Sequence, residues 1–231
     1  MPDIDIAAKD GGSFTGYLAT PDAGSAPGVV LIQEIFGVNQ VMRELADGLA
    51  AQGYVALCPD IFWRQEPGIQ ITDQSEEEWQ KAFQLFQGFD VGKGVDDLIA
   101  TLDHLRGVDG CNGKAGAVGY CLGGKLAYLM AARSDVDCSV GYYGVGIEEL
   151  TGEAGGISRP LLLHIAKQDG FVPPEAQAAV HAALDGNANV TLYDYEGADH
   201  AFARRGGEHY DRAATALANQ RTADFFAANL S

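Results

Sequence analysis

One stretch of the sequence decides the fold of this chain: Ala115-Gly116-Ala117-Val118-Gly119-Tyr120-Cys121-Leu122-Gly123. It opens with an apolar run typical of a strand buried on both faces, and a helical pattern follows over residues 122–133. Glycines stand two positions before and two positions after Cys121, as in the G-x-nucleophile-x-G turn between a strand and a helix. They are needed because side chains at those positions would collide in a strained turn. The stretch therefore predicts that Cys121 is a nucleophile.

The predicted turn also places the sulfur of Cys121 near the N-terminus of a helix. The helix dipole favours a thiolate there, and thiolate is the reactive form of cysteine. The alternative is a small core cysteine without chemistry, since free cysteines are often buried and inert. A redox or thiol-transfer role is disfavoured because no second cysteine is close to Cys121 in the sequence. The other three are expected to be free thiols in a reducing compartment, Cys58, Cys111 and Cys138.

Outward from this stretch, short apolar runs alternate with longer amphipathic segments. The apolar runs cover residues 29–32, 54–57, 115–118, 140–143, 161–165 and 190–193. The helical patterns cover residues 40–52, 75–87, 95–106, 122–133, 174–184 and 210–228. This alternation predicts an α/β fold, with a mostly parallel central sheet and helices on both faces. We expect a single domain over residues 1–231, with a hairpin over residues 4–18 at the sheet edge and the active site beyond the carboxyl ends of the strands.

Charge and composition exclude several classes of partner. The 231 residues carry a net charge of −17, which repels nucleic acid phosphates and anionic lipid headgroups. No segment has the length and apolarity of a transmembrane helix. The N-terminal residues 1–5 lack the basic start and apolar run of a signal peptide. We therefore expect a cytoplasmic protein without nucleic acid or membrane partners.

Two further side chains follow Cys121 in the order nucleophile, acid, histidine, which is the order of α/β-hydrolases. Asp169 stands in the loop after the apolar run 161–165, and His200 follows the run 190–193. We expect His200 to exchange protons with Cys121 and the leaving group, and Asp169 to orient its imidazole. Asp169 could instead be a turn residue, and His200 a solvated loop residue. Three separate loops in the expected order favour the catalytic interpretation.

The neighbouring candidates fit these roles less well. Asp199 is adjacent to His200, and neighbouring side chains rarely orient one another across a ring. His164 falls inside a predicted strand, and we expect His181 and His209 on helices. The sequence therefore favours His200 as the base.

The end of the first parallel strand supplies a second group of candidates. Glu34 directly follows the apolar run that includes residues 29–32, so it is expected inside the active site and not on the surface where glutamates usually lie. We expect the oxyanion hole to use the backbone N–H groups of Leu122 and Ile35.

The sequence resembles the dienelactone hydrolase family, which contains carboxymethylenebutenolidase-like enzymes. The resemblance extends from about residue 28 to the C-terminus. The matching pieces are residues 33–39, Gly53-Tyr54, Cys58-Pro59-Asp60, residues 119–124, residues 141–144, Gln168-Asp169, His200 and Phe202-Ala203-Arg204.

This resemblance implies a monomeric α/β-hydrolase that opens an enol-lactone, such as dienelactone to maleylacetate, through a thioester on Cys121. It implies that no metal and no organic cofactor takes part. It also implies that Glu34 takes the thiol proton when substrate arrives, after which the thiolate pairs with the imidazolium of His200. A physical reason is that two acidic groups close together in a dry site disfavour a second negative charge.

The resemblance weakens at the substrate carboxylate, which the family holds with two arginines. Arg204 matches one of them, and Trp79 stands where the other is expected. Losing one charge-assisted contact should weaken the binding of a carboxylate by about 1.5–3 kcal/mol. Arg64 or Arg205 could instead restore the clamp. The other residues expected to line the substrate pocket are Phe83, Phe86, Phe36 and Tyr142, and Ala201 replaces a small polar residue of the family.

The sequence thus predicts a cysteine-dependent hydrolase of a small-molecule lactone or ester. A carboxylated dienelactone is the substrate that the resemblance implies, and a less polar ester is the alternative that the Trp79 position favours. A non-catalytic binding protein on the same fold is the second alternative, because a fold alone does not guarantee chemistry.

Overall fold

The computed structural model describes residues 3–22 and 24–231, so Met1 and Pro2 of the N-terminal stretch discussed above lie outside the described residues. The chain forms two compact units, which we call unit 1 (Met1–Gly116) and unit 2 (Ala117–Ser231). The prediction of a single domain over residues 1–231 stays a prediction. No helix among the described residues is long and apolar enough to cross a membrane.

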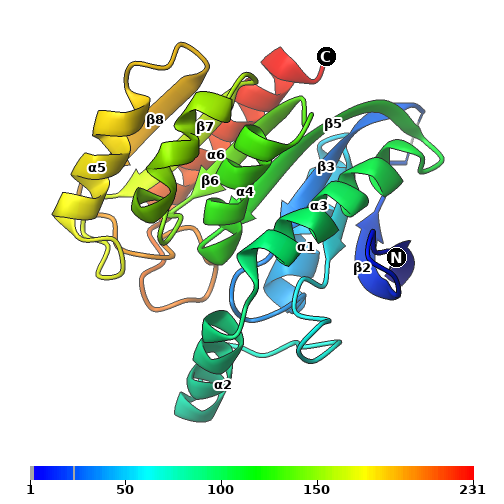
Figure 1. The fold of residues 1–231 in the computed structure, drawn as a ribbon, viewed down its shortest axis with the longest axis horizontal. Coiled ribbons are helices and arrows are strands. Elements are labelled where there is room, and N and C mark those ends of the chain that lie inside the picture. The colour runs from blue at the N-terminus through cyan, green and yellow to red at the C-terminus, as the bar shows by residue number, and fades with distance from the viewer. Residues whose placement is uncertain (1–2, 23) are drawn as a thin grey trace. The chain divides into compact units, whose positions relative to one another are not determined.

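Unit 1 contains strands β1 to β4, the start of β5, and helices α1 to α3 (Figure 1). Its elements are β1 (Asp3–Ala7), β2 (Ser13–Ala19), β3 (Ala26–Ile32), α1 (Gln40–Ala51), β4 (Val55–Pro59), α2 (Glu76–Gln87), α3 (Val91–Arg106) and the start of β5 (Cys111–Tyr120). The strand order is β1-β2-β4-β3-β5. β1 and β2 pair antiparallel with Asp3 opposite Tyr17, which confirms the predicted hairpin at the sheet edge.

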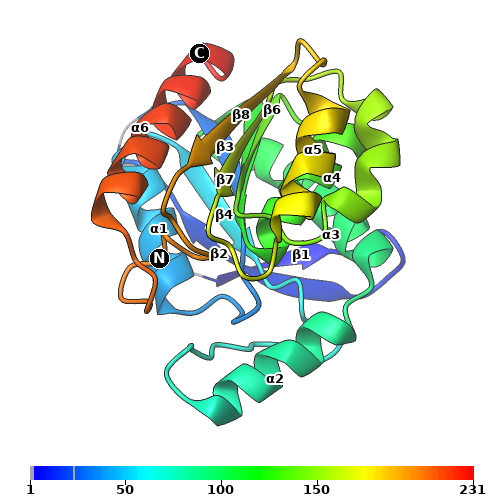
Figure 2. The ribbon, with the colours of Figure 1, turned by 90° about the vertical axis from the view of Figure 1, so that its left-hand side faces the viewer.

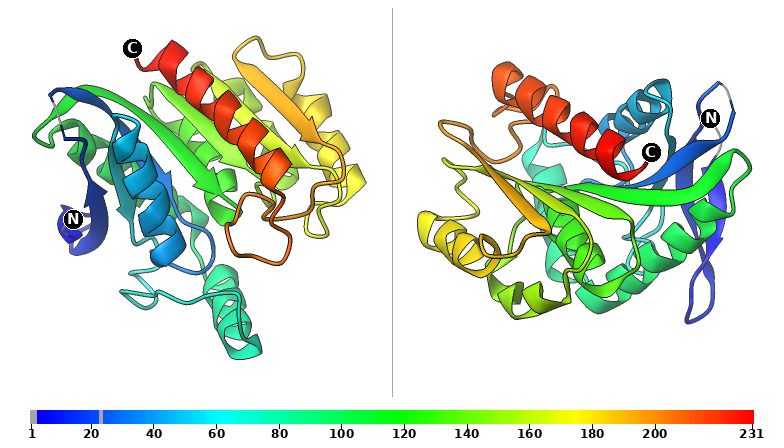
Figure 3. Two further views of the ribbon diagram at one scale, coloured as in Figure 1. Left: turned by 180° about the vertical axis from the view of Figure 1, so that it is seen from behind. Right: turned by 90° about the horizontal axis from the view of Figure 1, so that it is seen from above.

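The parallel part of unit 1 begins at β3, which pairs with β4 with Val29 opposite Ala56. Every residue of β4 is buried, as expected for a strand covered on both faces. Helix α3 contacts β3 and β4 from the front in Figure 1, and α1 contacts β2, β3 and β4 from the side that faces the viewer in the left panel of Figure 3.

Unit 2 continues from the end of β5 and carries the predicted nucleophile. Its elements are α4 (Leu122–Arg133), β6 (Cys138–Tyr142), the 3-10 helix η1 (Glu148–Gly156), β7 (Leu161–Ala166), α5 (Pro174–Leu184), β8 (Val190–Tyr195) and α6 (Arg212–Asn229). The strand order is β5-β6-β7-β8, in which β6 pairs parallel with β7, and β7 pairs parallel with β8. In Figure 2, α4 and α5 lie on one side of these strands and α6 lies on the other. The expected layers are therefore confirmed in each unit.

Helix boundaries differ from the sequence prediction where a cap was overlooked. Helix α3 begins at Val91 and not near residue 95, because the side chain of Asp90 accepts the backbone N–H of Lys93. Glycine is favoured at position 94, in the first turn, because a Cβ there would lie 2.3 Å from the ring of Phe89. Helix α2 is capped by Ser75, whose hydroxyl accepts the backbone N–H of Glu78 over 3.2 Å.

Candidate active site

Cys121 lies at the junction between β5 and α4 in a strained backbone conformation. Its φ is 55° and its ψ is −114°, values that few non-glycine residues adopt. A Cβ added at Gly119 would lie 2.0 Å from the carbonyl oxygen of Gly123, which confirms the steric reason for the glycine. The backbone N–H of Cys121 donates to the carbonyl of Tyr142 over 3.1 Å. The turn is therefore fixed by close packing and by a hydrogen bond to the end of β6.

Asp169 and His200 form a buried hydrogen bond in unit 2. His200 Nδ1 lies 2.8 Å from Asp169 Oδ2, and each residue is 5% exposed. The other carboxylate oxygen of Asp169 accepts the backbone N–H groups of Phe171 and Val172 over 2.8 and 3.2 Å. These bonds fix the orientation of the Asp169 carboxylate, so that its other oxygen faces the imidazole and keeps a proton on Nδ1.

The charge on His200 is set by opposing effects. Burial alone lowers the pKa of His200, but the charge and hydrogen bond of Cys121 together with those of Asp169 raise it to about 10. The site therefore favours the imidazolium form of His200. A cationic histidine between a sulfur and a carboxylate can stabilise negative charge on the sulfur and donate a proton to a leaving group.

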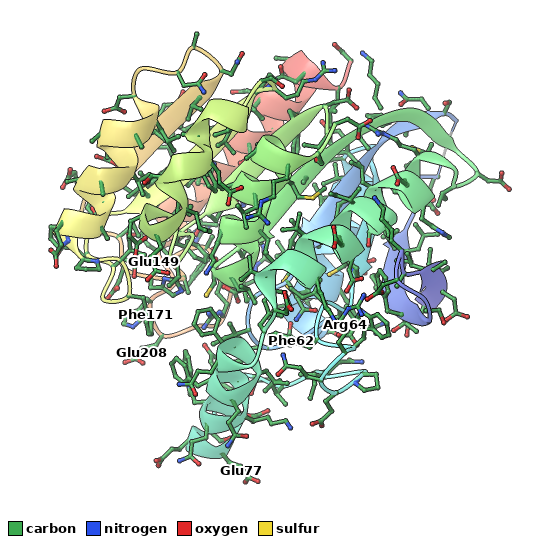
Figure 4. All side chains as sticks on the ribbon, viewed as in Figure 1. Phe62, Arg64, Glu77, Glu149, Phe171 and Glu208 are labelled. Carbon is green, nitrogen blue, oxygen red and sulfur yellow. The ribbon has the colours of Figure 1, made fainter. Side chains whose placement is uncertain are left out.

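Two aromatic rings enclose the imidazole of His200. Phe171 and Tyr143 each present an edge-to-face contact, with ring centroids 4.8 and 5.1 Å from that of His200. Tyr143 is buried, whereas Phe171 is 47% exposed and projects from the loop after β7 (Figure 4). Sequence reasoning missed both rings, although Phe171 stands only two residues after Asp169.

Backbone strain marks the same region. Among the described residues, the non-glycine residues with positive φ are Cys121 (55°), Tyr143 (38°) and Ala201 (61°). They belong to the turn after β5, the end of β6 and the loop after β8. Such strain persists where the surrounding structure forces it, and it gathers at functional sites. This observation is independent of side-chain chemistry and indicates the same site.

The other histidines have different environments. His164 is buried, and its Nδ1 and Nε2 lie 2.8 Å from Tyr195 Oη and 2.9 Å from Thr222 Oγ1. The Thr222 hydroxyl lies 2.6 Å from Tyr142 Oη, which in turn donates to Asn219 Oδ1. Burial lowers the pKa of His164 to about 3, so this histidine is neutral and structural.

His181 lies on α5, as predicted, whereas His209 lies in the loop before α6 and not on a helix. His181 contacts Asp185 and Asp194, and His209 Nδ1 lies 3.5 Å from a carboxylate oxygen of Asp199. Asp199 bonds the backbone N–H of His200 over 2.6 Å. The carboxylate bonded to the imidazole of His200 is therefore that of Asp169.

The substrate-pocket candidates in unit 1 form an aromatic cluster, which we define as Phe36, Trp79 and Phe83. The ring of Trp79 meets Phe36 edge-on at 5.0 Å and stacks on Phe83 at 5.5 Å. Trp79 Nε1 donates to the carbonyl of Asp73, which fixes the indole. Phe83 is partly exposed, and Phe86 lies on the same helix, α2.

Glu34 and Ile35 are also in unit 1, directly beyond β3. Both are buried, and the buried amide of Gln33 donates to the carbonyl of Glu34. The side-chain oxygen of Gln33 accepts a hydrogen bond from the backbone N–H of Ile61 over 3.3 Å. Gln33 therefore ties the segment that carries Glu34 to the loop after β4.

The cations suggested for the carboxylate clamp differ in their environments. Arg64, which is labelled in Figure 4, bonds both carboxylate oxygens of Asp97 and both of Asp10 at 2.7 to 2.9 Å, so its guanidinium is engaged within unit 1. Arg204 in unit 2 is 8% exposed, and Arg205 is exposed. The pairing of Arg64 disfavours its predicted alternative role as a substrate ligand.

Tyr142 and Leu122 complete the predicted site residues in unit 2. Tyr142 is fully buried, and its hydroxyl is directed to Thr222 and Asn219 of α6. The substrate contact predicted for it stays a prediction. Leu122 is the first residue of α4, where backbone N–H groups lack acceptors within the helix.

A small cavity of about 20 Å³ lies beside Asp169, lined also by Tyr143, His164 and Gln177. It is large enough for one water molecule. Among residues 3–22 and 24–231, no group of three His, Cys, Asp or Glu side chains could hold a metal ion.

Comparisons with known proteins show the family to which the chain belongs. The model of the dienelactone hydrolase family matches residues 14–230. A protein of Azospirillum brasilense, provisionally named a carboxymethylenebutenolidase, is 54% identical, with 100% of each chain covered. The carboxymethylenebutenolidase of Pseudomonas putida is 43% identical over 97% of this chain and 95% of its own. A crystal structure from Klebsiella pneumoniae subsp. pneumoniae, provisionally assigned as a dienelactone hydrolase, has a TM-score of 0.86 and 26% identity, covering 98% of this chain and 97% of its own.

Proposed function

Because the chain belongs to the dienelactone hydrolase family, we propose that it hydrolyses an enol-lactone or related ester through a thioester on Cys121. The observation that carries this proposal is the buried Asp169–His200 hydrogen bond, with a raised His200 pKa to which Cys121 contributes. A nucleophile, a base and an orienting acid in this arrangement form the machinery of acyl transfer.

In the proposed reaction, the Cys121 sulfur attacks the carbonyl carbon of the substrate. The carbonyl oxygen becomes an oxyanion, which the backbone N–H of Leu122 stabilises. Collapse of this intermediate breaks the carbon–oxygen bond of the ester, and the leaving oxygen takes a proton from His200. The neutral imidazole then takes a proton from water, whose oxygen attacks the thioester and releases the carboxylic acid and the Cys121 thiolate, which regains the proton that the thiol gave up before its attack.

Two roles in this scheme rest on the sequence and on the family resemblance. We assign Ile35 as the second oxyanion donor and Glu34 as the acceptor of the thiol proton. Their burial directly after β3 supports these assignments. Replacement of Glu34 by glutamine should slow acylation and leave hydrolysis of the thioester less affected, which single-turnover kinetics can separate.

The proposed substrate is a small enol-lactone of the dienelactone type, converted to a maleylacetate-type acid by the protein acting as a monomer. The second candidate is a less polar ester. It is favoured by the aromatic cluster around Trp79 and by the engagement of Arg64 with Asp97 and Asp10. A steady-state comparison of a carboxylated dienelactone with neutral aryl esters decides between them, and a large preference for the dienelactone would exclude the second.

The cysteine mechanism is tested by Cys121→Ala, with Cys111→Ala as the control because Cys111 lies at the start of β5. We expect the first variant to lose turnover and the acyl-enzyme mass adduct, and the control to keep both. Undiminished lactone and ester hydrolysis in Cys121→Ala would refute the mechanism. Absence of hydrolysis in the wild type across both substrate classes would favour a non-catalytic binding protein.

A further inference from the structure

Gln177, in the first turn of α5, bonds both ends of the loop that carries Asp169. The loop joins β7, which ends at Ala166, to α5, which begins at Pro174. Gln177 Nε2 donates to the carbonyl of Ala166 over 3.2 Å and to the carbonyl of Val172 over 2.8 Å. Both hydrogens of one side-chain nitrogen are therefore used, and the two acceptors flank Asp169 three residues away on either side.

We propose that Gln177 is a positioning residue, which holds the loop closed so that Asp169 faces His200. The proposal rests on the proposed function and deepens it. A residue that does not belong to the group of Cys121, Asp169 and His200 orients the acid of that group, Asp169.

The chemistry of the position explains why glutamine fits it. Gln177 is 2% exposed, so a charged donor would lose its hydration there without a compensating partner. Two backbone carbonyls require two donors, and the amide supplies both from one neutral group. The reverse orientation of the amide would direct its oxygen at two carbonyl oxygens, which is repulsive.

The remaining contacts of the loop show what Gln177 adds. The carboxylate of Asp169 accepts N–H groups from Phe171 and Val172, so it follows the backbone of the loop rigidly. The backbone N–H of Gln168 donates to the carbonyl of Ala198, two residues before His200. Movement of Val172 away from Ala166 therefore turns the carboxylate relative to the imidazole, and Gln177 opposes that movement.

The experiment compares Gln177→Met with the wild type. Methionine keeps the length and volume of the side chain but donates no hydrogen bond. The first readout is the pKa of His200 from an NMR titration without substrate, and the second is kcat/KM against pH for an aryl ester. We expect the His200 pKa to fall by about one unit, because the contribution of Asp169 weakens. We expect kcat/KM to fall about tenfold to hundredfold, as for small misplacements of catalytic groups.

Other charges near His200 do not depend on Gln177. Titratable groups of unit 2 that contact His200 include Cys121, Asp169, Tyr143 and Asp199. Cys121 and Tyr143 follow β5 and β6, and Asp199 lies on the same loop as His200. A selective fall in the His200 pKa therefore reports on Asp169.

The matched control is Leu184→Ala, a fully buried residue at the other end of α5. It should lower the melting temperature while leaving the His200 pKa and kcat/KM unchanged. Unchanged values of both in Gln177→Met would overturn the proposal and leave Gln177 a stabilising residue only. If Gln177→Met does not fold, Gln177→Asn replaces it, because the shorter amide reaches at most one carbonyl and should give a smaller change in the same direction. Failure of the proposed function would appear as an inactive wild type, and the NMR titration would still decide the role of Gln177.

Discussion

Replacement of Asp169 by asparagine tests the candidate active site most directly. Asparagine has the same shape, but it carries no charge and can present an N–H in place of a carboxylate oxygen. The side-chain oxygen of asparagine can still accept the backbone N–H groups of Phe171 and Val172, whereas His200 Nδ1 then faces an NH₂ group in place of a carboxylate oxygen. The perturbation is therefore confined to the electrostatics and the tautomer of His200.

The magnitude follows from the raised pKa of His200. The pKa is about 10 against 6.5 for an ordinary histidine, a difference that corresponds to about 5 kcal/mol in favour of the imidazolium. Cys121 and Asp169 share this effect and also overcome the burial of the ring. Because Asp169 supplies only part of this effect, its replacement should cost about 2–3 kcal/mol, which is about a 30- to 150-fold loss in kcat/KM if the imidazolium develops in the transition state.

The assay combines steady-state hydrolysis of an aryl ester with an NMR titration of His200. We expect the His200 pKa and kcat/KM to fall together, with KM less affected than kcat. Asp194→Asn is the control, since Asp194 pairs with Lys167 and His181 away from the imidazole of His200. A kcat/KM within fivefold of the wild type and an unshifted His200 pKa would show that Asp169 does not act on the histidine.

Three further predictions concern the interior of unit 2 and its thiols. Thr222→Val should lower the free energy of unfolding by about 2–4 kcal/mol in chemical denaturation, because buried His164 and Tyr142 each lose a partner, whereas Thr222→Ser should be close to the wild type. The folded-state pKa of His164 is about 3, below its value of 6.5 in the unfolded chain. As the pH falls, the unfolded state therefore binds a proton that the folded state does not, and the free energy of unfolding should fall by about 2 kcal/mol between pH 7 and pH 5. A His164→Gln variant that kept the same dependence of unfolding free energy on pH would contradict this. Burial raises the pKa of the Cys138 thiol to about 12, so iodoacetamide should leave Cys138 unmodified in the folded protein and alkylate it after denaturation, as peptide mass mapping can show.

The local features of the site were predictable because they are encoded by neighbouring residues. Gly119 and Gly123 specify the turn at Cys121, and the clash of 2.0 Å at Gly119 gives the reason. Alternation of apolar runs and helical patterns specified the parallel strands, because a strand buried on both faces needs apolar residues throughout. Only local caps such as Asp90 were overlooked, and they moved a boundary without changing the fold.

Long-range contacts could not be predicted from the sequence. Arg64 was a candidate for the substrate clamp, but Asp97 lies 33 residues away in the chain and engages it. Phe171 and Gln177 had no motif, and their importance follows from the ring and the carbonyls that they contact.

The sequence by itself determined the α/β class, the turn that carries Cys121, and the order in which Asp169 and His200 follow it. These features depend on periodicity and on steric demands within a few residues. Only the tertiary structure decided the ionisation of His200, the neutrality of His164 and the role that Gln177 can have. Charge and hydrogen bonding depend on burial and on partners distant in the chain, and folding alone brings those partners to within bonding distance.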